Sequence, residues 1–450
     1  MPTASTGTRR RARVAAAASA TAAALALGVL PAHATTTATP SSSTTTSAGP
    51  SAALSGRLDR EALRASLDAF HQAGMYGAYS AVRDGSREWR GATGIADVDT
   101  RRPTRPDFEH RVGSITKTFT SVAVLQQVAR GKVDLDAPVG RYLPDLVPGE
   151  RGRRITVRML LNHTSGVNDF VLAAFPGLAE DPGKALDEGR FRHHEPADLA
   201  RLGLAQPPVA EPGGKHVYSN TNYVLAGLVL EKVTGQDAEA YITRNVIRKA
   251  GLRHTYFPAS PRIKGPHSKM YESFYGYIDP ARDYSTYDMS WAWTAGALVS
   301  TTSDLNDFYR RLLTGGLLGP AELKEMKKGV PAYEPEPGQE ALMRYGLGLY
   351  TIKMPNGGWY WGHDGAVFGA GTWALSSEDG RRQVAIGYNY MKYERFAPDG
   401  TPLPDPIGEA LVAHVDGALA GTGKSSRKAA AATAPLLAPR AVVPAERFLR

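Results

Sequence analysis

The sequence contains no cysteine among its 450 residues. Such a chain forms no disulfide and carries no thiol nucleophile, so burial of apolar surface has to stabilise it. It also has no H-E-x-x-H pair and no glycine-rich nucleotide loop, and the adjacent His193 and His194 would point apart on a helix or a strand. We therefore predict no metal site and no cofactor.

An excess of charge is also lacking over most of the chain. The formal net charge is +9, but the first 34 residues contribute +4 and residues 421–450 contribute +5. The body between them is neutral, which argues against nucleic acid as a partner, because nucleic-acid binding requires a basic face. We interpret residues 421–450 as a basic, low-complexity, solvated tail.

The longest apolar run, over residues 14–30, is shorter than the roughly 20 residues that a membrane span needs. It follows the basic stretch at residues 9–13 and precedes the small-x-small sequence Ala32-His33-Ala34, as in a secretory signal peptide. We predict that residues 1–34 are removed on export and that the protein is secreted without a stable membrane anchor. A retained membrane helix is the alternative. The Ser/Thr-rich residues 35–53 are predicted to be a disordered linker, followed by a folded domain over residues 54–420.

Apolar periodicity places helices and strands within this domain. Helical spacing is found over residues 58–72, 114–129, 221–233 and 407–419, and a further helix opens at residues 302–304. Strand patterns occupy residues 77–83, 88–94, 346–352, 358–362, 371–376 and 381–388, with hairpin turns predicted at Asp84-Gly85 and Asp379-Gly380. The predicted fold class is α/β (α+β), an antiparallel sheet flanked by N- and C-terminal helices. An all-helical lobe is inserted at about residues 120–315, and a site is expected where the two parts meet.

The sequence Ser114-Ile115-Thr116-Lys117 places a serine and a lysine three residues apart at the start of a predicted helix. This spacing puts both side chains on one face. Serine is a weak nucleophile until a neighbouring base takes its proton, and a lysine can do so when burial or other cations lower its pKa. The alternative is that Ser114 only caps the helix and that Lys117 is solvated.

Tyr218-Ser219-Asn220 follows a Pro-Gly-Gly turn and precedes the helix predicted over residues 221–233. Tyr218 can carry a proton if a nearby cation such as Lys117 lowers its pKa. Asn220 can hold a substrate amide and the lysine head, or it can simply be the helix N-cap.

His363-Asp364-Gly365 is predicted to lie where the strand over residues 358–362 ends. Gly365 has no side chain to block a substrate lying against this edge. A backbone N–H here, together with that of Ser114, would form an oxyanion hole. The alternative is a hairpin turn with a surface histidine.

The order of the three strings is more informative than any one of them. A second S-x-x-K, Ser425-Ser426-Arg427-Lys428, lies in the tail and is accidental, and G-x-S-x-G is absent. Only the joint set places a nucleophile at a helix start, a Tyr/Asn pair on a loop and a His-x-Gly on a late strand. It predicts a serine enzyme that works by acyl transfer.

The set S-x-x-K, Y-x-N and H-x-G resembles the superfamily of serine beta-lactamases and penicillin-binding proteins, of the class C type. Longer runs carry the resemblance over residues 58–419, most closely to the secreted D-alanyl-D-alanine carboxypeptidases of Streptomyces. These runs are Arg111-Val112-Gly113-Ser114, Gly131-Lys132-Val133-Asp134-Leu135-Asp136, Asn162-His163-Thr164-Ser165-Gly166, Tyr218-Ser219-Asn220-Thr221-Asn222 and Trp291-Ala292-Trp293-Thr294-Ala295-Gly296.

The resemblance implies a role for each matching residue. Ser114 is the acylated nucleophile, Lys117 and Tyr218 carry protons, and Asn220 holds substrate and lysine. The N–H groups of Ser114 and Ala366 form the oxyanion hole, in the strand that contains His363, Asp364 and Gly365. Phe175 and Trp291 match positions that line the cleft in such carboxypeptidases, although both can equally be ordinary buried aromatic residues.

The sequence departs from the carboxypeptidases where these bind the free carboxylate of their substrate. They use two threonines and an arginine, and the corresponding residues here are Asp364, Ala366 and Tyr350. Two like charges about 4 Å apart in a partly screened cleft repel by a few kcal/mol. We expect Asp364 to repel a terminal carboxylate unless it is protonated, or unless Arg344 or Lys353 compensates.

Three functions remain open from the sequence. The first is a D-alanyl-D-alanine carboxypeptidase-like peptidase acting on D-configured peptide bonds, such as those of peptidoglycan stem peptides. The second is an esterase, amidase, D-aminopeptidase or beta-lactamase that uses the same site. The third is a binding protein for penicillin or peptidoglycan that no longer catalyses. The expected partners are small peptides, esters or beta-lactams, and the protein is expected to be a monomer.

Overall fold

The computed structural model describes residues 58–335 and 338–421. The predicted signal peptide, the linker and residues 422–450 of the tail lie outside the described residues.

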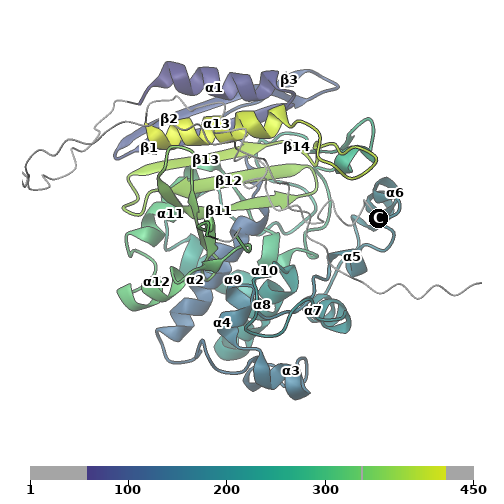
Figure 1. Cartoon of the computed structure of the whole chain (residues 1–450), viewed down its shortest axis with the longest axis vertical. Helices are drawn as coiled ribbons and strands as arrows, with labels where there is room; N and C mark the ends of the chain where they lie inside the picture. The colour runs from purple at the N-terminus through teal and green to yellow at the C-terminus, as the bar shows by residue number, and fades with distance from the viewer. Residues whose placement is uncertain (1–57, 336–337, 422–450) are drawn as a thin grey trace, which may run out of the picture. The chain divides into compact units, whose positions relative to one another are not determined.

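The central element is a nine-stranded antiparallel sheet in the order β3-β2-β1-β13-β12-β11-β10-β9-β8 (Figure 1). Its strands are β1 (Gly77–Asp84), β2 (Arg87–Asp97), β3 (Arg102–Pro103), β8 (Val330–Pro331), β9 (Met343–Tyr345), β10 (Tyr350–Lys353), β11 (Trp359–Val367), β12 (Ala370–Ser376) and β13 (Arg382–Tyr388). The sheet joins both ends of the described chain, because β1 pairs with β13.

Five short strands form two small sheets outside the large one. They are β4 (His110–Arg111) with β7 (Val299–Ser300), and β5 (Tyr271–Glu272) between β6 (Arg282–Asp283) and β14 (Tyr390–Met391). Two-residue strands have no alternation pattern, so the sequence did not predict them.

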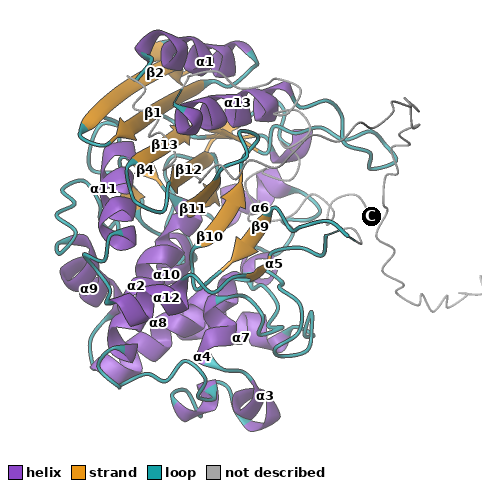
Figure 2. Cartoon of the chain, turned by 60° about the vertical axis from the view of Figure 1, so that its left-hand side comes forward, coloured by secondary structure: helices purple, strands orange, loops and turns teal. Residues whose placement is uncertain are grey.

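Two helices from opposite ends of the domain cover one face of the large sheet. They are α1 (Arg60–Gln72) and α13 (Pro406–Ala420), which lie together above the strands in Figure 2. Asp59 caps α1 through a hydrogen bond from the Ala62 N–H, 2.9 Å. Along β13, Val384 and Ile386 pack into the apolar core beneath these helices, whereas Ala385 packs into the core on the other face. This alternation is what a strand buried on both faces produces.

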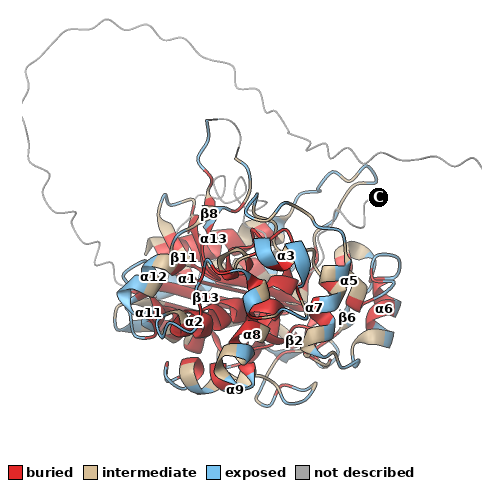
Figure 3. Ribbon diagram, turned by 90° about the horizontal axis from the view of Figure 1, so that it is seen from below, coloured by how far each residue is buried: buried red, intermediate tan, exposed pale blue. Residues whose placement is uncertain are grey.

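The other face carries α11 (Thr302–Leu313) and the helical lobe. The remaining helices are α2 (Thr116–Val128), α3 (Gly149–Arg154), α4 (Val157–Leu161), α5 (Val171–Ala174), α6 (Pro182–Gly189), α7 (Pro196–Ala205), α8 (Asn220–Thr234), α9 (Ala238–Ile242), α10 (Trp293–Gly296) and α12 (Pro320–Met326). Short helical turns are η1 (Gly113–Ile115), η2 (Val139–Arg141), η3 (Thr243–Ile247) and η4 (Phe274–Gly276). Helices α2 and α8 are buried almost all round, as Figure 3 shows. The predicted fold class is confirmed.

Two predicted strand boundaries were wrong. The strand predicted over residues 346–352 begins only at Tyr350 with β10, because residues 346–349 form the turn of the hairpin that joins β10 to β9. The strand predicted to end at Gly362 continues through His363-Asp364-Gly365 to Val367. Gly362 and Gly365 suggested a strand end. A Cβ at either would lie 1.9 Å from a backbone oxygen of a neighbouring segment, so these glycines permit close approach of another chain segment.

No helix among the described residues combines the length and the apolar character needed to cross a bilayer.

Candidate active site

Ser114 lies in η1, the tight turn that leads into α2. Gly113 precedes it with φ +52°, a conformation that favours glycine, and a Cβ there would lie 2.7 Å from the Ala366 nitrogen. The turn is tied to its surroundings by Thr116, whose Oγ1 donates to the Gly113 carbonyl at 2.7 Å and accepts from the Leu298 N–H at 3.1 Å. Ser114 itself is partly exposed, so a substrate can reach its hydroxyl.

Lys117 is fully buried, one turn after Ser114. Its Nζ lies 2.9 Å from Ser114 Oγ, 2.7 Å from Asn220 Oδ1 and 2.8 Å from the Ala295 carbonyl oxygen. The alternative of a solvated lysine is thereby excluded. As an ammonium, Lys117 donates to all three oxygens, and as an amine it keeps two of these bonds and accepts the Ser114 proton. The arrangement therefore serves both proton states of a general base.

Tyr218 lies beside the same ammonium. Its ring centroid is 4.9 Å from Lys117 Nζ, and the ring is tilted against that of His163 at a centroid distance of 4.1 Å. The loop that carries Tyr218 is held by His163 Nδ1, which accepts from the Ser219 N–H at 3.2 Å. The cap residue of α8 is Ser219, so the alternative that Asn220 is only an N-cap is wrong.

Asp169 is a site residue that the sequence did not reveal. Its Oδ2 accepts from the backbone N–H of Asn220 at 2.7 Å and from Asn220 Nδ2 at 2.8 Å. The Asn220 amide is therefore oriented with its oxygen toward Lys117. Burial raises the pKa of Asp169, while the bonds from Asn220 and the Lys117 charge oppose this shift. Its only signal in the sequence is its place four residues after Ser165, close behind the run Asn162-His163-Thr164-Ser165-Gly166.

Strand β11 forms the opposite side of the site. The last residue pair between β10 and β11 is Tyr350 with Gly362, so His363-Asp364-Gly365-Ala366 continues beyond the end of β10. Beyond this last pair the strand passes next to the Ser114 turn. A Cβ on Gly365 would lie 3.1 Å from the Ser114 nitrogen. The backbone amides of Ser114 and Ala366 thus lie in one tightly packed patch, which suits a pair of oxyanion donors.

His363 and Asp364 are both buried, with exposures of 1% and 5%. His363 Nε2 lies 2.7 Å from the Tyr345 hydroxyl, and its Nδ1 lies 3.8 Å from Asp364 Oδ1. A surface histidine in a hairpin turn is therefore excluded.

The two cations that would have to compensate the charge of Asp364, Arg344 and Lys353, make contacts of their own. Arg344 donates to the Gly329 carbonyl at 3.0 Å, and Lys353 lies 3.4 Å from Glu340. Lys353 pairs with Trp359, five residues from Asp364 along β11, which corresponds to about 17 Å of strand.

Phe175 and Trp291 meet each other, with ring centroids 5.6 Å apart and edge-to-face. Both also contact Phe368, which follows β11, at centroid distances of 5.3 and 5.2 Å. All three rings are at most 3% exposed. They form an aromatic group at the end of the strand that carries Ala366.

Within residues 58–335 and 338–421, no group of three or more His, Cys, Asp or Glu side chains is placed to hold a metal ion. The chemistry that the site can support is acyl transfer by a serine, with a lysine and a tyrosine as proton carriers.

Comparison with known proteins agrees with this chemistry. The family model described as Beta-lactamase matches residues 60–403. A D-stereospecific amidohydrolase from Streptomyces sp. is 36% identical, with a TM-score of 0.67, and the match covers 74% of this chain and 95% of that one. The D-amino acid amidase of Ochrobactrum anthropi SV3 shares the fold at 24% identity, with a TM-score of 0.63 over 73% of this chain and 90% of that one.

Among curated proteins, Esterase EstB of Burkholderia gladioli is 37% identical over 211 residues, which are 44% of this chain and 53% of the esterase. The chain spans about half to three fifths of the length of the curated relatives that it matches first.

Proposed function

Because this chain belongs to the beta-lactamase family of serine hydrolases, we propose that it hydrolyses amides and peptides of D-amino acids through an acyl-enzyme on Ser114. The observation that carries the proposal is the position of Lys117 Nζ, between Ser114 Oγ at 2.9 Å and Asn220 Oδ1 at 2.7 Å. The 36% identity to a D-stereospecific amidohydrolase supports the choice of substrate.

The reaction follows from the positions of these groups. Ser114 Oγ attacks the substrate carbonyl carbon and loses its proton to Lys117. The oxyanion of the tetrahedral intermediate accepts hydrogen bonds from the Ser114 and Ala366 N–H groups. Tyr218 donates a proton to the leaving nitrogen as the C–N bond breaks, and Lys117 restores the proton of Tyr218. Water then attacks the ester by the reverse sequence and releases the acid.

Asp364 favours an amidase over a D-alanyl-D-alanine carboxypeptidase. Asp364 is buried in the part of β11 whose next residue, Gly365, packs against the Ser114 turn, and a carboxylate there disfavours a substrate that ends in a second carboxylate. Arg344 and Lys353 are engaged with Gly329 and Glu340, which supports the same choice. We infer that the preferred substrates carry a neutral or cationic group on the leaving side, so stem peptides that end in a free carboxylate are poorer substrates.

The direct test compares Ser114→Ala with the wild type on D- and L-phenylalanine amide. We expect the wild type to release ammonia from the D-amide, and the variant to lose kcat by roughly 10⁴-fold or more, because the nucleophile is gone. Ser425→Ala, in the second S-x-x-K, is the matched control and should retain full activity. Equal activity of Ser114→Ala and wild type would refute the proposal.

A fluorescent penicillin separates the alternatives that share this site. Stable labelling that Ser114→Ala abolishes indicates a penicillin-binding peptidase. Rapid release of hydrolysed penicillin indicates a beta-lactamase. Stable labelling without turnover of any amide, ester or peptide indicates the non-catalytic binding protein.

An esterase is the second candidate function, favoured by the 37% identity to Esterase EstB. The same acyl-enzyme forms from an ester, whose leaving alcohol needs less assistance from Tyr218 than an amine does. Tyr218→Phe distinguishes the two functions. If the protein is an amidase, the variant should lose much more of its activity on amides than on p-nitrophenyl esters. If it is an esterase, the wild type hydrolyses p-nitrophenyl esters but not amides.

Asp364→Thr tests the argument about the substrate carboxylate. We expect the variant to gain tenfold or more in kcat/KM on an acyl-D-alanyl-D-alanine with a free carboxylate, because a repulsion of a few kcal/mol is removed and about 1.4 kcal/mol corresponds to a factor of ten. Its activity on the C-terminally amidated peptide should change little. An unchanged ratio between these two substrates would show that Asp364 does not govern the choice of leaving group.

We also propose that the protein is exported and processed after Ala34, as the sequence of residues 1–34 predicts. N-terminal sequencing of protein collected from the culture medium should start at Thr35. A cell-bound protein with an intact N-terminus would contradict this.

A further inference from the structure

The turn between β11 and β12 follows directly on the strand that carries Ala366. Val367 pairs with Ala370, so Phe368 and Gly369 form a two-residue turn. Gly369 has φ +75°, whereas Phe368 is not among the residues with positive φ. Two-residue hairpins favour turns with positive φ at the first central position, because only these match the strand twist. The turn at Phe368 therefore depends on support from outside the hairpin.

Glu272, in β5, supplies this support. Its Oε2 accepts from the Gly369 N–H at 3.1 Å, and its Oε1 accepts from the Phe274 N–H at 3.0 Å. Lys392 Nζ lies 2.7 Å from Glu272 Oε2. The side chains of Glu272 and Lys392 are 0% and 1% exposed, so the turn is fixed by a fully buried ion pair. Removing both charges from water costs free energy that can exceed their attraction, so a buried ion pair on its own adds little to the stability of a protein.

Strained backbone gathers around the same pair. Six residues other than glycine have positive φ within the described chain, and Phe274, Tyr275 and Lys392 are three of them, at +48°, +62° and +47°. The Tyr275 N–H donates to the Lys392 carbonyl at 2.6 Å, which joins the two segments. Strain of this kind persists where the surroundings impose it, and it clusters at functional sites.

The ion pair also contacts the ring of Phe368. Lys392 Nζ lies 4.4 Å from the Phe274 ring centroid and 5.4 Å from that of Phe368. Phe368 in turn meets Phe175 and Trp291. Lys392 thus holds the Phe368 ring by a cation–π contact while Glu272 holds its backbone turn.

The direction of β11 shows which part of a substrate would meet this ring. Tyr218 lies near His363, with ring centroids 6.4 Å apart, and Tyr218 is the proposed proton donor to the leaving group. The strand runs from His363 past Ala366 to the turn at Phe368. The leaving group therefore lies toward His363, and the acyl group lies toward Phe368.

We propose that Phe368 is a specificity-determining residue that selects an aromatic side chain on the acyl side of the substrate, and that the Glu272–Lys392 ion pair is its positioning device. This inference rests on the proposed function. The three rings are buried against one another at the acyl end of the strand, and an aromatic side chain of the substrate that reaches this end would meet them in the edge-to-face contacts that aromatic groups prefer. Glu272 and Lys392 act only through the position of Phe368.

The test compares D-phenylalanine amide with D-alanine amide, because both release ammonia and differ only in the acyl side chain. We expect the ratio of kcat/KM for D-phenylalanine amide to kcat/KM for D-alanine amide to fall about tenfold in Phe368→Ala and in Lys392→Met. The change should come mainly from a higher KM for D-phenylalanine amide. A factor of this size is expected when one well-placed apolar contact is removed. Lys269→Met is the matched control, since Lys269 also pairs with carboxylates, those of Asp97 and Asp99, but at a partly exposed position. Its ratio should equal that of the wild type. A ratio within twofold of wild type in folded Phe368→Ala and Lys392→Met overturns the proposal.

Two further measurements test the proposal if a variant does not fold or if the wild type does not hydrolyse amides. Glu272→Gln combined with Lys392→Met leaves no unpaired buried charge, and it should also lower the ratio if Lys392→Met is insoluble. Binding of D-phenylalanine and D-alanine to Ser114→Ala, measured by calorimetry, tests the pocket without catalysis. Tighter binding of D-phenylalanine that Phe368→Ala removes supports the inference even if amide hydrolysis is absent, and equal binding of both amino acids contradicts it.

Discussion

At the scale of single residues, the carboxylate of Asp169 decides how the proposed general base is held. It bonds both N–H groups of Asn220, and Asn220 in turn presents its oxygen to Lys117. Asp169 Oδ1 also accepts from the Val171 N–H at 2.9 Å, so both of its oxygens are acceptors. An asparagine at position 169 would place its own side-chain NH₂ group against an N–H donor of Asn220 or Val171.

We therefore predict that Asp169→Asn lowers kcat by about 10- to 100-fold, which corresponds to the roughly 1.4–2.7 kcal/mol lost when a hydrogen bond to a charged group is replaced by a donor clash. The value of KM should change less, and the pH profile of kcat should shift, because the carboxylate near Lys117 is lost. Asp181→Asn is the control, since Asp181 likewise caps a backbone N–H, that of Lys184, away from the site. Equal kinetics of the two variants would remove Asp169 from the site.

The sequence predicted the convergence of Ser114, Lys117 and Tyr218 but not the residue that holds Asn220. The first two share a helix turn, so their contact follows from spacing alone. Asp169 meets Asn220 across 51 residues of chain, in a loop that has no periodicity. Such a contact depends on tertiary packing, which composition and spacing do not encode.

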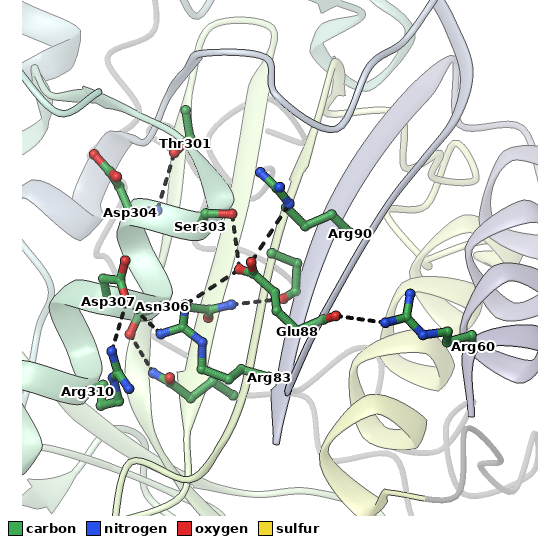
Figure 4. Close-up of polar contacts among 12 residues, drawn as sticks. Arg60, Arg83, Glu88, Arg90, Thr301, Ser303, Asp304, Asn306, Asp307 and Arg310 are labelled. Carbon is green, nitrogen blue, oxygen red and sulfur yellow. Dashed lines mark hydrogen bonds and ion pairs between the residues drawn. The ribbon is translucent and has the colours of Figure 1, made fainter. Parts of the chain in front are cut away.

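At the scale of elements, a polar network fastens α11 to strands β1 and β2 of the large sheet (Figure 4). Arg83 of β1 pairs with Asp307 at 2.6 Å, and Ser303 Oγ lies 3.2 Å from Glu88 of β2. Deeper in the same interface, the buried Asn306 donates through Nδ2 to the Ala81 carbonyl at 3.0 Å. The buried member should matter most, because exposed pairs are screened by water.

We predict that Asn306→Ala lowers the free energy of unfolding by about 1–3 kcal/mol, since it removes a buried hydrogen bond and leaves space behind. Ser303→Ala, at the rim of the same network, should change it by less than about 0.5 kcal/mol. Urea unfolding followed by circular dichroism measures both variants. The critical result is which variant loses more free energy of unfolding. A larger loss in Ser303→Ala than in Asn306→Ala would show that the exposed contacts, and not the buried hydrogen bond, stabilise the packing of α11 on the sheet.

Strand ends were the elements that the sequence predicted least well. Gly362 and Gly365 suggested that a strand stops, although β11 continues to Val367. The strand instead needs glycine where the Val112 carbonyl and β12 approach its backbone. The long helices α1, α2, α8 and α13 were predicted within a few residues, because a long periodic pattern averages over single glycines, whereas the short helices of the inserted lobe were not predicted individually.

At the scale of the whole molecule, stability in acid depends on histidines that are buried between layers. His414 of α13 is 0% exposed and lies between Ser66 Oγ at 2.8 Å and Ser80 Oγ at 3.0 Å, which joins both covering helices to the sheet. Burial lowers the pKa of His414 to about 4, and it lowers the pKa of His110 to about 4 as well. Between pH 4 and 6.5 the unfolded chain therefore binds more protons than the folded protein, and stability falls as the pH falls through this window.

Other buried groups change the stability with pH in the opposite direction. The contribution of His414 therefore cannot be read from the pH dependence of the wild type alone. Burial raises the pKa of Glu239 and of Glu394 to about 7, and each gives stability that is lost as the pH rises from 4.5 to 7. We therefore predict a difference between the wild type and His414→Gln, a variant that keeps a polar side chain but does not titrate. The variant should be less stable than the wild type at pH 7, and this deficit should shrink by on the order of 3 kcal/mol on going to pH 4, because a pKa shift of about 2.5 units is removed. Urea unfolding of both proteins at pH 7, 5.5 and 4 measures the difference, and a deficit that stays constant over this range would show that His414 is not held neutral in the fold.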